Sequence, residues 1–478
     1  MNNEKKLYLV YPKKLGVIAP EIYGHFAEHI GGVIYGGIWV GKESEIPNIN
    51  GFRKDIIEKL RAINAPVIRW PGGCFAEIYD WRDGIGKNRP TRINWWGYRD
   101  GKYEPNTVGT HEFMDFCEAV GAKAYFAANL TSVTPLHIRN WMDYCLSPQG
   151  STTLALEREA NGHPEPFDIP FWGVGNENWG GGGSMTPEQY ADEFRRFYTV
   201  MKNAFGNTEY FMCGENGMDY GWTDRVIRNA CGLGDGFTSH YYCGTAGEAV
   251  EFSDDDWDTL IKKAHDMEEL IERNVNIIRG SGSSVKLVID EWGCWHKEGS
   301  GPSGGENLFE QQSTVRDAVV TALTLNIFNS HCKDIRMANA AQLVNNLHTL
   351  FLADGENCIT TPTYHVFDMY KEHMGADSIE CVVTDNEALS SAISVSASVK
   401  DGKTLVTVCN LSCRDEALVS LEGVGGAIPQ NVRAEILSSD DIHAHNTFEK
   451  PNEVAPKEIS ISADRFVLPK GSVMKISF

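Results

Sequence analysis

Two glutamates follow apolar runs of the sequence. Glu177 ends the stretch Phe171-Trp-Gly-Val-Gly-Asn-Glu177, and Glu291 follows the run Val285-Lys-Leu-Val-Ile-Asp290. Both runs are typical of buried parallel strands, so both carboxyls are expected at the carboxyl ends of strands. Two carboxyl groups facing each other across a glycosidic bond are what glycoside hydrolysis requires. A single glutamate at a strand end is more often structural than catalytic, so the pair is what favours a sugar-cleaving site.

The neighbours of the two glutamates suggest different roles. An acid must keep its proton near neutral pH, and the neutral residues Asn176 and Asn178 suit Glu177 to that role. A nucleophile must stay ionised. Arg69, at the end of an earlier apolar run, is expected to lie beside Glu291 and to hold it as a carboxylate.

Short apolar strands alternate with amphipathic helices over residues 18–375, which predicts a (β/α)8 barrel for this part of the chain. A doubly wound open sheet is the alternative, but no Gly-x-Gly-x-x-Gly turn follows the first strand. The predicted strands are Ile22–Glu28, Val67–Trp70, Ala124–Asn129, Phe171–Glu177, Tyr210–Gly214, Gly236–Tyr242, Lys286–Glu291 and Ile335–Gln342. Helical patterns include Phe52–Ile63, His111–Val120, Pro135–Cys145, Pro187–Phe205, Trp257–Ile278 and Glu310–Asn329.

Polar residues cluster at the predicted strand ends, where barrels carry their chemistry. On this count Glu177 and Glu291 fall on strands four and seven, whose ends can face each other across the barrel mouth. The long connection from Pro71 to Gly109 is expected to form a wall of the cleft with Trp96. The other polar strand ends carry Glu28, Arg69, Asn129, Asn176, Glu215, His240 and Gln342.

Several other residues could carry chemistry. Glu215 is the best rival carboxylate, whereas Asp290 is expected to point away from Glu291, into a helix layer or a salt bridge. Cys74 has no evident base, so it is interpreted as a thiol that lines the cleft. The glycine run 180–183 has no Gly-Lys-Ser/Thr after it, so it is expected to let the backbone approach a ligand closely. The pattern His25-Phe-Ala-Glu-His29 matches a zinc motif that requires a helix, but the glycines after it favour a strand.

After residue 375 the hydrophobic pattern changes to alternation with period two, which predicts a β-sandwich over residues 376–478. Asp401-Gly402 is a hairpin turn signal. Residues 1–17, which include the apolar segment Leu7–Val10, are expected to add a strand to this domain. The alternating segments are Ile393–Val399, Thr404–Asn410, Val432–Leu437 and Ile459–Ser462.

Composition limits the possible partners and location. The formal net charge of −22 argues against nucleic acid or an anionic membrane surface as a partner. The twelve cysteines form no CxxC pair, so neither a disulfide framework nor a zinc site is expected. No apolar segment long enough for a membrane span and no signal peptide core is present. We therefore expect a reduced, cytoplasmic protein whose substrate arrives as imported oligosaccharide.

Four motifs carry a family resemblance. Ile22-Tyr-Gly-His-Phe-Ala-Glu-His29, Arg69-Trp-Pro-Gly-Gly-Cys-Phe75, Trp172-Gly-Val-Gly-Asn-Glu177 and Ile289-Asp-Glu-Trp292 resemble those of the α-L-arabinofuranosidases of glycoside hydrolase family 51. The resemblance covers nearly the whole chain. It implies a retaining enzyme with a (β/α)8 barrel and a jelly-roll β-sandwich, no metal or other cofactor, and a homo-oligomer, often a hexamer.

The resemblance also implies roles for single residues. Glu177 matches the acid/base of the family and Glu291 its nucleophile, and Cys74 stands where other members carry asparagine. Further matches, all implied to contact arabinose or line its pocket, are Glu28, Asn176, Tyr242, Trp295 and Gln342. The predicted substrate-binding set is therefore Glu28, Arg69, Cys74, Trp96, Asn176, His240, Tyr242, Trp295 and Gln342.

The resemblance therefore implies an exo-acting hydrolase that releases terminal α-L-arabinofuranosyl residues from arabinoxylan- or arabinan-derived oligosaccharides by double displacement. Three alternatives remain open. An endo-acting glucanase or xylanase on the same barrel would need an open groove. A non-catalytic carbohydrate-binding protein would bind without turnover, and a metal-dependent barrel hydrolase would lose activity with a chelator.

Overall fold

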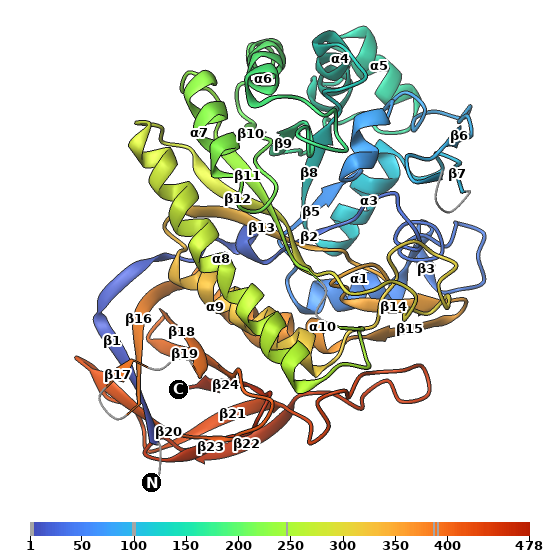
Figure 1. The fold of residues 1–478 in the computed structure, drawn as a ribbon. Helices are drawn as coiled ribbons and strands as arrows, with labels where there is room; N and C mark the ends of the chain where they lie inside the picture. Colours follow the sequence, from blue (N-terminus) through green and yellow to red (C-terminus); the bar gives the residue numbers. More distant parts are fainter. Residues whose placement is uncertain (1–3, 98–101, 245–246, 386–387, 390–391) are drawn as a thin grey trace.

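The computed structural model describes residues 4–97, 102–244, 247–385, 388–389 and 392–478. It contains a closed barrel of eight parallel strands and a separate, mostly antiparallel sheet. Figure 1 shows the barrel with its helices above the sheet domain, and β1 (Glu4–Val17) running down from the barrel into that sheet. The predicted fold class is therefore confirmed.

The barrel strands follow one another around the ring in chain order. Each predicted strand has a counterpart in the structure, so the repeating unit is confirmed, with ends that differ by a few residues. The shortest strand, β2, covers only the middle three residues of the first predicted one. The strands are β2 (Gly24–Phe26), β5 (Val67–Trp70), β8 (Lys123–Ala128), β9 (Phe171–Val174), β10 (Glu209–Met212), β11 (Gly236–Cys243), β12 (Lys286–Cys294) and β13 (Ile335–Ala341), and β13 closes the ring against β2.

Helices cover the outside of the barrel (Figure 1). In the part of the chain that the structure describes, six helices match the helical patterns in the sequence, and three others had no predicted counterpart. Thr186 caps α6 together with Gln189, and Ser253 caps α8 together with Asp256. The matched helices are α1 (Lys54–Ala62), α3 (Thr110–Val120), α4 (Pro135–Leu146), α6 (Pro187–Lys202), α8 (Asp254–Gly280) and α9 (Val315–Ser330), and the additional ones are α5 (Thr153–Ala160), α7 (Tyr220–Asn229) and α10 (Pro362–Tyr370).

Short elements connect these units. Three 3-10 helices and several two-stranded ribbons lie in the loops. They are η1 (Pro20–Tyr23), η2 (Cys74–Ile78), η3 (Lys371–His373), β3 (Asn48–Ile49), β4 (Phe52–Arg53), β6 (Arg92–Ile93), β7 (Tyr103–Glu104), β14 (Phe351–Asp354) and β15 (Asn357–Thr360). Among the described residues, no helix is long and apolar enough to cross a membrane.

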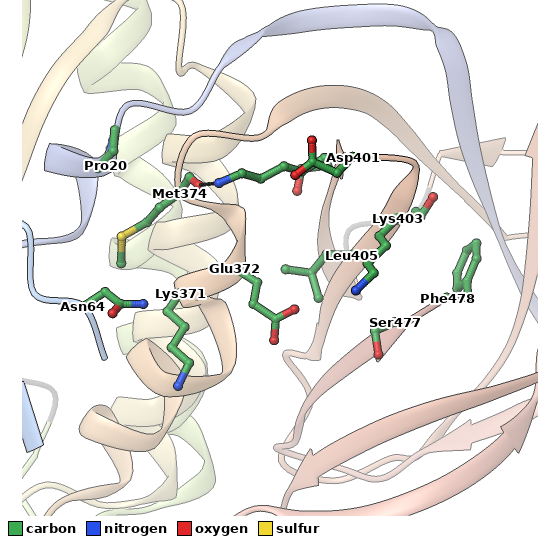
Figure 2. Close-up of a pocket in the computed structure, with 13 residues that line it drawn as sticks. Pro20, Asn64, Lys371, Glu372, Met374, Asp401, Lys403, Leu405, Ser477 and Phe478 are labelled. Carbon is green, nitrogen blue, oxygen red and sulfur yellow. Dashed lines mark hydrogen bonds between the residues drawn. The ribbon is translucent and has the colours of Figure 1, made fainter. Parts of the chain in front are cut away.

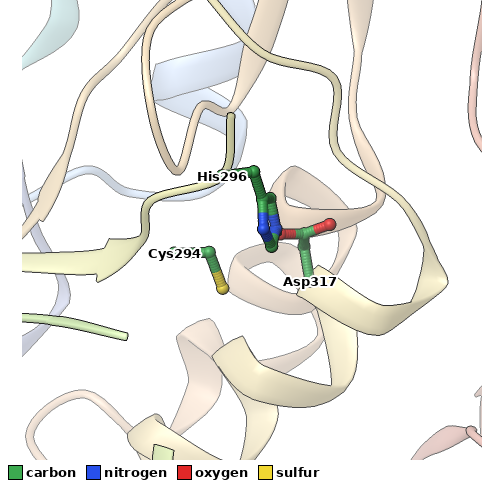
Figure 3. A group of neighbouring side chains, drawn as sticks. All are labelled: Cys294, His296 and Asp317. Carbon is green, nitrogen blue, oxygen red and sulfur yellow. The ribbon is translucent and has the colours of Figure 1, made fainter. Parts of the chain in front are cut away.

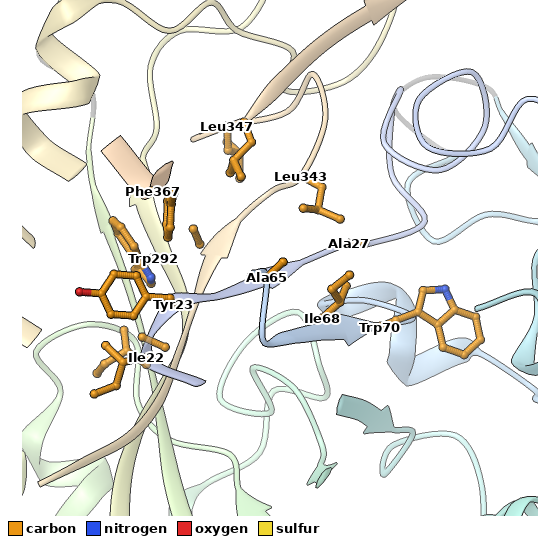
Figure 4. Close-up of a cluster of buried hydrophobic side chains, with 14 of the residues drawn as sticks. Ile22, Tyr23, Ala27, Ala65, Ile68, Trp70, Trp292, Leu343, Leu347 and Phe367 are labelled. Atoms are coloured by element: carbon orange, nitrogen blue, oxygen red, sulfur yellow. The ribbon is translucent and has the colours of Figure 1, made fainter. Parts of the chain in front are cut away.

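Side chains alternate along the barrel strands between the interior and the helix layer. On β5, Val67 belongs to a small cluster inside the barrel, whereas Ile68 and Trp70 belong to the large cluster outside it. Arg69 therefore shares the inner face with Val67. Figure 4 shows part of the outer cluster, where Ile68 lies near Ala65 and Trp292 lies near Phe367. The interior cluster consists of Val67, Tyr125, Phe171, Phe211, Val288 and Met337.

The second domain is a single sheet that folds back on its own core. Leu9 of β1 and Ile436 near one edge of the sheet belong to one buried cluster with Phe466 of the opposite edge. Such closure gives a sandwich its two faces. The strands besides β1 are β16 (Asp377–Asp385), β17 (Ala388–Leu389), β18 (Ile393–Lys400), β19 (Lys403–Asn410), β20 (Ala417–Val424), β21 (Asn431–Leu437), β22 (Lys457–Ser462), β23 (Phe466–Leu468) and β24 (Val473–Ser477).

The first strand joins the sheet from the other end of the chain. β1 pairs antiparallel with β16 and parallel with β20. Asp401 and Gly402, both with positive φ, form the predicted turn between β18 and β19. On this topology we propose domain boundaries after residues 17 and 375.

The two domains pack against each other through polar and apolar contacts. The indole of Trp257 on α8 donates to the carbonyl of Leu411 at 2.8 Å, and Arg414 pairs with Asp258 at 2.6 Å. Figure 2 shows a groove at this junction, in which Lys400 of the sheet donates to the carbonyl of Met374 at 2.9 Å.

Candidate active site

A small cavity at the carboxyl ends of the barrel strands gathers most of the predicted site residues. Its volume is about 50 Å³. Both glutamates line it, and so do the predicted substrate-binding residues except Arg69 and His240, which are buried and contact the glutamates. The lining residues are Glu28, Ile30, Gly73, Cys74, Trp96, Asn176, Glu177, Tyr242, Glu291, Trp295, Phe309, Gln342 and Leu347.

The two glutamates approach each other across this cavity. One carboxyl oxygen of Glu177 and one of Glu291 lie within 4.8 Å of each other, and a nitrogen of His240 lies within the same distance of both. Glycosidases that retain configuration have carboxyls about 5–5.5 Å apart, whereas those that invert it need about 6.5–9.5 Å. The spacing agrees with the shorter class. The side chain of Glu177 is 21% exposed and that of Glu291 is 8% exposed.

Glu291 is held by two hydrogen-bond donors and lies beside a third positively charged or polar group, His240. Arg69 donates from Nη1 to Oε1 at 2.7 Å, and the hydroxyl of Tyr242 donates to Oε2 at 2.8 Å. Nδ1 of His240 lies 3.4 Å from Oε2. Burial raises the pKa of the Glu291 carboxyl, and the positive charges of His240 and Arg69 oppose that rise. Arg69 thus lies beside Glu291, as the sequence predicted.

His240 joins the two glutamates to a third carboxylate. Its Nδ1 lies 2.9 Å from Oε1 of Glu177, and its Nε2 lies 3.0 Å from Oδ1 of Asp290. Burial lowers the pKa of His240, but Glu291 and Asp290 together raise it well above its ordinary value. His240 is therefore a cation that donates to Glu177.

The prediction for Asp290 was wrong about its direction. Asp290 does form salt bridges, but it lies inside the barrel, 3.4 Å from Nε of Arg69, and accepts a hydrogen bond from Tyr125 at 3.0 Å. The reason is a β-bulge in β12. Ile289 pairs with Ala338 of β13 and Trp292 with Ala340, so β12 contains one extra residue between these two pairs. The bulge turns both Asp290 and Glu291 inward.

The surroundings of Glu177 also differ from the prediction. Its sequence neighbours point elsewhere, because Asn176 accepts from Arg69 at 2.6 Å and Asn178 donates to Glu77 at 3.0 Å. The groups that contact the carboxyl are His240 and the thiol of Cys74, which donates to Oε2 at 3.5 Å. Burial raises the pKa of Cys74. Cys74 lines the cavity as a neutral thiol, in agreement with its interpretation from the sequence.

A second polar group lies on the far side of the cavity. Glu28 accepts from the backbone N–H of Phe75 at 3.0 Å and from the indole of Trp96 at 3.2 Å. The amide of Gln342 donates to its other oxygen at 3.2 Å. Burial and the charge of Glu291 raise the pKa of Glu28 to about 7. These acceptors and donors suit the hydroxyls of a sugar.

Sequence reasoning predicted Trp96 and Trp295 on the cavity wall but missed two other apolar residues there, Phe309 and Leu347. Phe309 packs edge-on against Trp295 with ring centroids 4.9 Å apart, and Trp295 in turn lies 5.2 Å from Tyr242. Phe309 and Leu347 both have positive φ and lie in loops. No periodic pattern marks such positions, so the sequence offered no signal for them.

The glycine run after Glu177 packs against the turn that carries Glu177. A Cβ added at Gly182 would lie 1.6 Å from the carbonyl oxygen of Asn176, and one at Gly181 would lie 2.8 Å from the thiol of Cys74. The close approach that the sequence predicted is therefore made to the protein's own backbone and side chains.

The zinc pattern does not form a metal site in the described chain. His25 lies in β2, and both of its ring nitrogens are buried without a hydrogen-bond partner. His29 is engaged by Glu104 at 2.9 Å and by the indole of Trp70 at 2.9 Å. Neither histidine belongs to a group of ligands close enough to share an ion.

A buried cluster of ionisable residues and the rival carboxylate Glu215 both lie outside the lining of the cavity. Figure 3 shows Cys294 and His296 near Asp317, but Asp317 accepts from His296 at 2.8 Å and caps α9 through Thr314. The guanidinium of Arg316 lies 3.4 Å from the other nitrogen of His296 and disfavours a cation there. Glu215, the rival carboxylate, is fully buried and does not line the cavity.

Comparisons with known proteins agree on one family. Residues 59–259 match the model of the α-L-arabinofuranosidase 1 domain, and residues 290–472 match that of the α-L-arabinofuranosidase C-terminal domain. An intracellular exo-α-L-arabinofuranosidase from Bacteroides ovatus is 38% identical over 96% of this chain and 93% of its own length.

Solved structures give the same result for the fold. The family 51 arabinofuranosidase from Xanthomonas axonopodis pv. citri superposes with a TM-score of 0.94 at 37% identity, covering 100% of both chains. A bifunctional glucanase–xylanase from a metagenome library, at 13% identity and a TM-score of 0.65, covers 100% of this chain and 99% of its own, and shares the fold alone.

Proposed function

Because the chain belongs to the α-L-arabinofuranosidases of glycoside hydrolase family 51, we propose that it is a retaining, exo-acting enzyme. Its substrates are oligosaccharides derived from arabinoxylan or arabinan, from which it releases terminal α-L-arabinofuranosyl residues. One observation carries the proposal of retention. One carboxyl oxygen of Glu177 lies within 4.8 Å of one of Glu291, which is close to the roughly 5–5.5 Å of retaining enzymes and short of the roughly 6.5–9.5 Å of inverting ones.

The reaction proceeds by two displacements. A carboxylate oxygen of Glu291 attacks the anomeric carbon while the bond to the departing oxygen breaks, and Glu177 gives its proton to that oxygen. Glu177 then takes a proton from a water that attacks the same carbon, and the bond to Glu291 breaks. Two inversions at one carbon release arabinose with retained configuration.

The charges around the pair favour this division of roles. Arg69 and His240 supply two positive charges, and Asp290 and Glu291 supply two negative charges that contact them. These four side chains and a protonated Glu177 together carry no net charge. As the covalent intermediate forms, the charge of Glu291 is consumed, and a carboxylate on Glu177 then pairs with the His240 cation at 2.9 Å.

The shape of the cavity favours exo action. Trp96, Trp295 and Phe309 form an aromatic wall beside the small cavity that Glu177 and Glu291 line. Such a site suits one terminal sugar, whereas an endo-acting glucanase or xylanase needs a groove that is open at both ends. Glu28, Asn176 and Gln342 are proposed to bind the hydroxyls of the arabinose.

The remaining proposals concern the setting of the enzyme. We place it in the cytoplasm, because the Bacteroides ovatus relative is named intracellular and the twelve cysteines are free thiols in the structure. The net charge of −22 makes nucleic acid an unsuitable partner. The family resemblance implies a homo-oligomer, with a hexamer as the expected state, and light scattering after gel filtration measures it.

A substrate panel with one variant tests the proposal. We expect turnover of 4-nitrophenyl α-L-arabinofuranoside and none of the corresponding β-xylopyranoside or β-glucopyranoside. In Glu177→Ala, azide should restore turnover and yield an arabinosyl azide, because azide attacks the intermediate without a general base. Absence of turnover on the arabinofuranoside would refute the specificity, and absence of rescue would refute the role of Glu177.

A further inference from the structure

A buried carboxylate joins the two loops that flank the acid glutamate. Glu77 lies on η2 and is fully buried. Its Oε1 accepts from the backbone N–H of Asn176 at 2.7 Å and from the side-chain amide of Asn178 at 3.0 Å. Its Oε2 accepts from the backbone N–H groups of Leu130 and Thr131, both at 2.8 Å. One side chain thus ties the loop after β9 to the loop after β8.

The residues that Glu77 holds are those on either side of Glu177. Glu177 has a φ of 44°, which is the left-handed region. This conformation is unfavourable for a residue other than glycine, so the surrounding structure must maintain it. The bonds from Asn176 and Asn178 to Glu77 fix the backbone before and after this strained position.

Asn178 extends the same network to the glycine run. Besides its bond to Glu77, its amide donates to the carbonyl of Gly182 at 2.6 Å. Gly182 in turn donates from its backbone N–H to the carbonyl of Glu177 at 3.0 Å. The turn that carries the acid is therefore closed by a ring of hydrogen bonds anchored on Glu77.

We propose that Glu77 is a positioning residue for the acid/base step, whose carboxylate holds the Glu177 turn so that its carboxyl reaches the departing oxygen. This proposal depends on the proposed function of Glu177. All the described hydrogen bonds to the carboxyl of Glu77 come from N–H donors, so both carboxyl oxygens must accept. A glutamine at this position would present an NH2 group to two N–H donors, which cannot bond to it. The two hydrogen bonds that one carboxyl oxygen accepts would therefore be lost.

A second buried glutamate provides a matched control. Glu215 is fully buried like Glu77, and its carboxyl accepts from Ser239 at 2.7 Å, Asn274 at 2.7 Å and Thr223 at 3.1 Å. None of these donors lies next to Glu177 in the chain. Glu215→Gln therefore reports the effect of changing a buried carboxyl in this barrel without touching the Glu177 turn.

The test uses the dependence of kcat/KM on the leaving group. For a retaining glycosidase, kcat/KM reports the first displacement, which needs an acid when the leaving group is poor and hardly needs one when it is good. We compare phenyl with 2,4-dinitrophenyl α-L-arabinofuranoside in wild type, Glu77→Gln, Asn178→Ala, Glu215→Gln and Glu177→Ala. Glu77→Gln is expected to lose about tenfold or more on the phenyl substrate, part of the 10²–10⁴-fold that an acid supplies, and less than about threefold on the dinitrophenyl substrate.

Each outcome decides the proposal. Equal losses on both substrates for Glu77→Gln, or the same selective loss in Glu215→Gln, would assign Glu77 a merely structural role. If Glu77→Gln does not fold, Asn178→Ala, which removes one donor of the network, must show the selective loss instead. If Glu177→Ala shows no selective loss, the proposed function fails, whereas a selective loss in Glu177→Ala alone overturns only the role of Glu77.

Discussion

Replacing Gly182 by alanine is expected to displace the acid glutamate. The added Cβ would lie 1.6 Å from the carbonyl oxygen of Asn176, whereas carbon and oxygen atoms in contact lie about 3.3–3.6 Å apart. The glycine run or the turn of Glu177 must therefore move by more than about 1 Å. A displacement of that size costs about 100-fold in rate. We expect kcat/KM of Gly182→Ala to fall by about that factor, with a stability loss of about 1–3 kcal/mol.

The same loop offers the control. A Cβ at Gly180 meets nothing within 4 Å, so Gly180→Ala should keep kcat/KM within about threefold of wild type. Initial rates on 4-nitrophenyl α-L-arabinofuranoside and a thermal melt of each variant make the comparison. The reasoning is refuted if Gly182→Ala stays within about threefold of wild type, or if both variants lose activity equally.

Three further predictions concern charge and metal. Arg69→Met should lower the free energy of unfolding by about 3–5 kcal/mol near pH 7, because it leaves Asp290 and Glu291 buried without their shared cation. Despite burial, Arg69 and His240 hold the pKa of Asp290 below its ordinary 3.8. The stability lost in Arg69→Met should therefore shrink as the pH falls below that value. Melts at pH 7 and pH 3 that show equal losses of stability would contradict this prediction. Burial and the charge of Glu291 raise the pKa of Glu28 to about 7, so the folded state binds this proton more tightly than the unfolded state. The free energy of unfolding should therefore decline from about pH 4.5 to pH 7. Glu28→Gln should flatten that part of the plot of melting midpoint against pH, and an unchanged slope would contradict this prediction. Dialysis against EDTA should leave kcat unchanged, and activity that is lost and then restored by zinc would disprove this.

The fold could be predicted from the sequence because the hydrophobic periodicity of each segment, and the order of strands and helices, can be recognised from neighbouring residues alone. The β5 segment Val67–Trp70 was predicted with its ends, since a short apolar run bounded by proline leaves little freedom. The helix α7 was missed because its sequence signal is weak: the N-cap residue Asp219 is followed by few apolar residues. The ten-residue helix nonetheless buries Trp222 and Val226.

The candidate site was predictable only where strand ends determine it. Glu177, Glu291 and Arg69 follow apolar runs, so the barrel rule brings them together. The inward orientation of Asp290 depends on a β-bulge. A bulge arises from the pairing of two strands, so the sequence of one strand alone does not reveal it. Glu77 was missed for a similar reason, since its donors come from two other loops.

The central claim is that Glu177 and Glu291 act as a retaining pair, and the configuration of the first product tests it most directly. Proton NMR of a fresh reaction with 4-nitrophenyl α-L-arabinofuranoside in the presence of methanol identifies the transfer product before any anomers interconvert. We expect methyl α-L-arabinofuranoside. Formation of the β-linked methyl glycoside, or of β-arabinofuranose as the first hydrolysis product, would contradict the account.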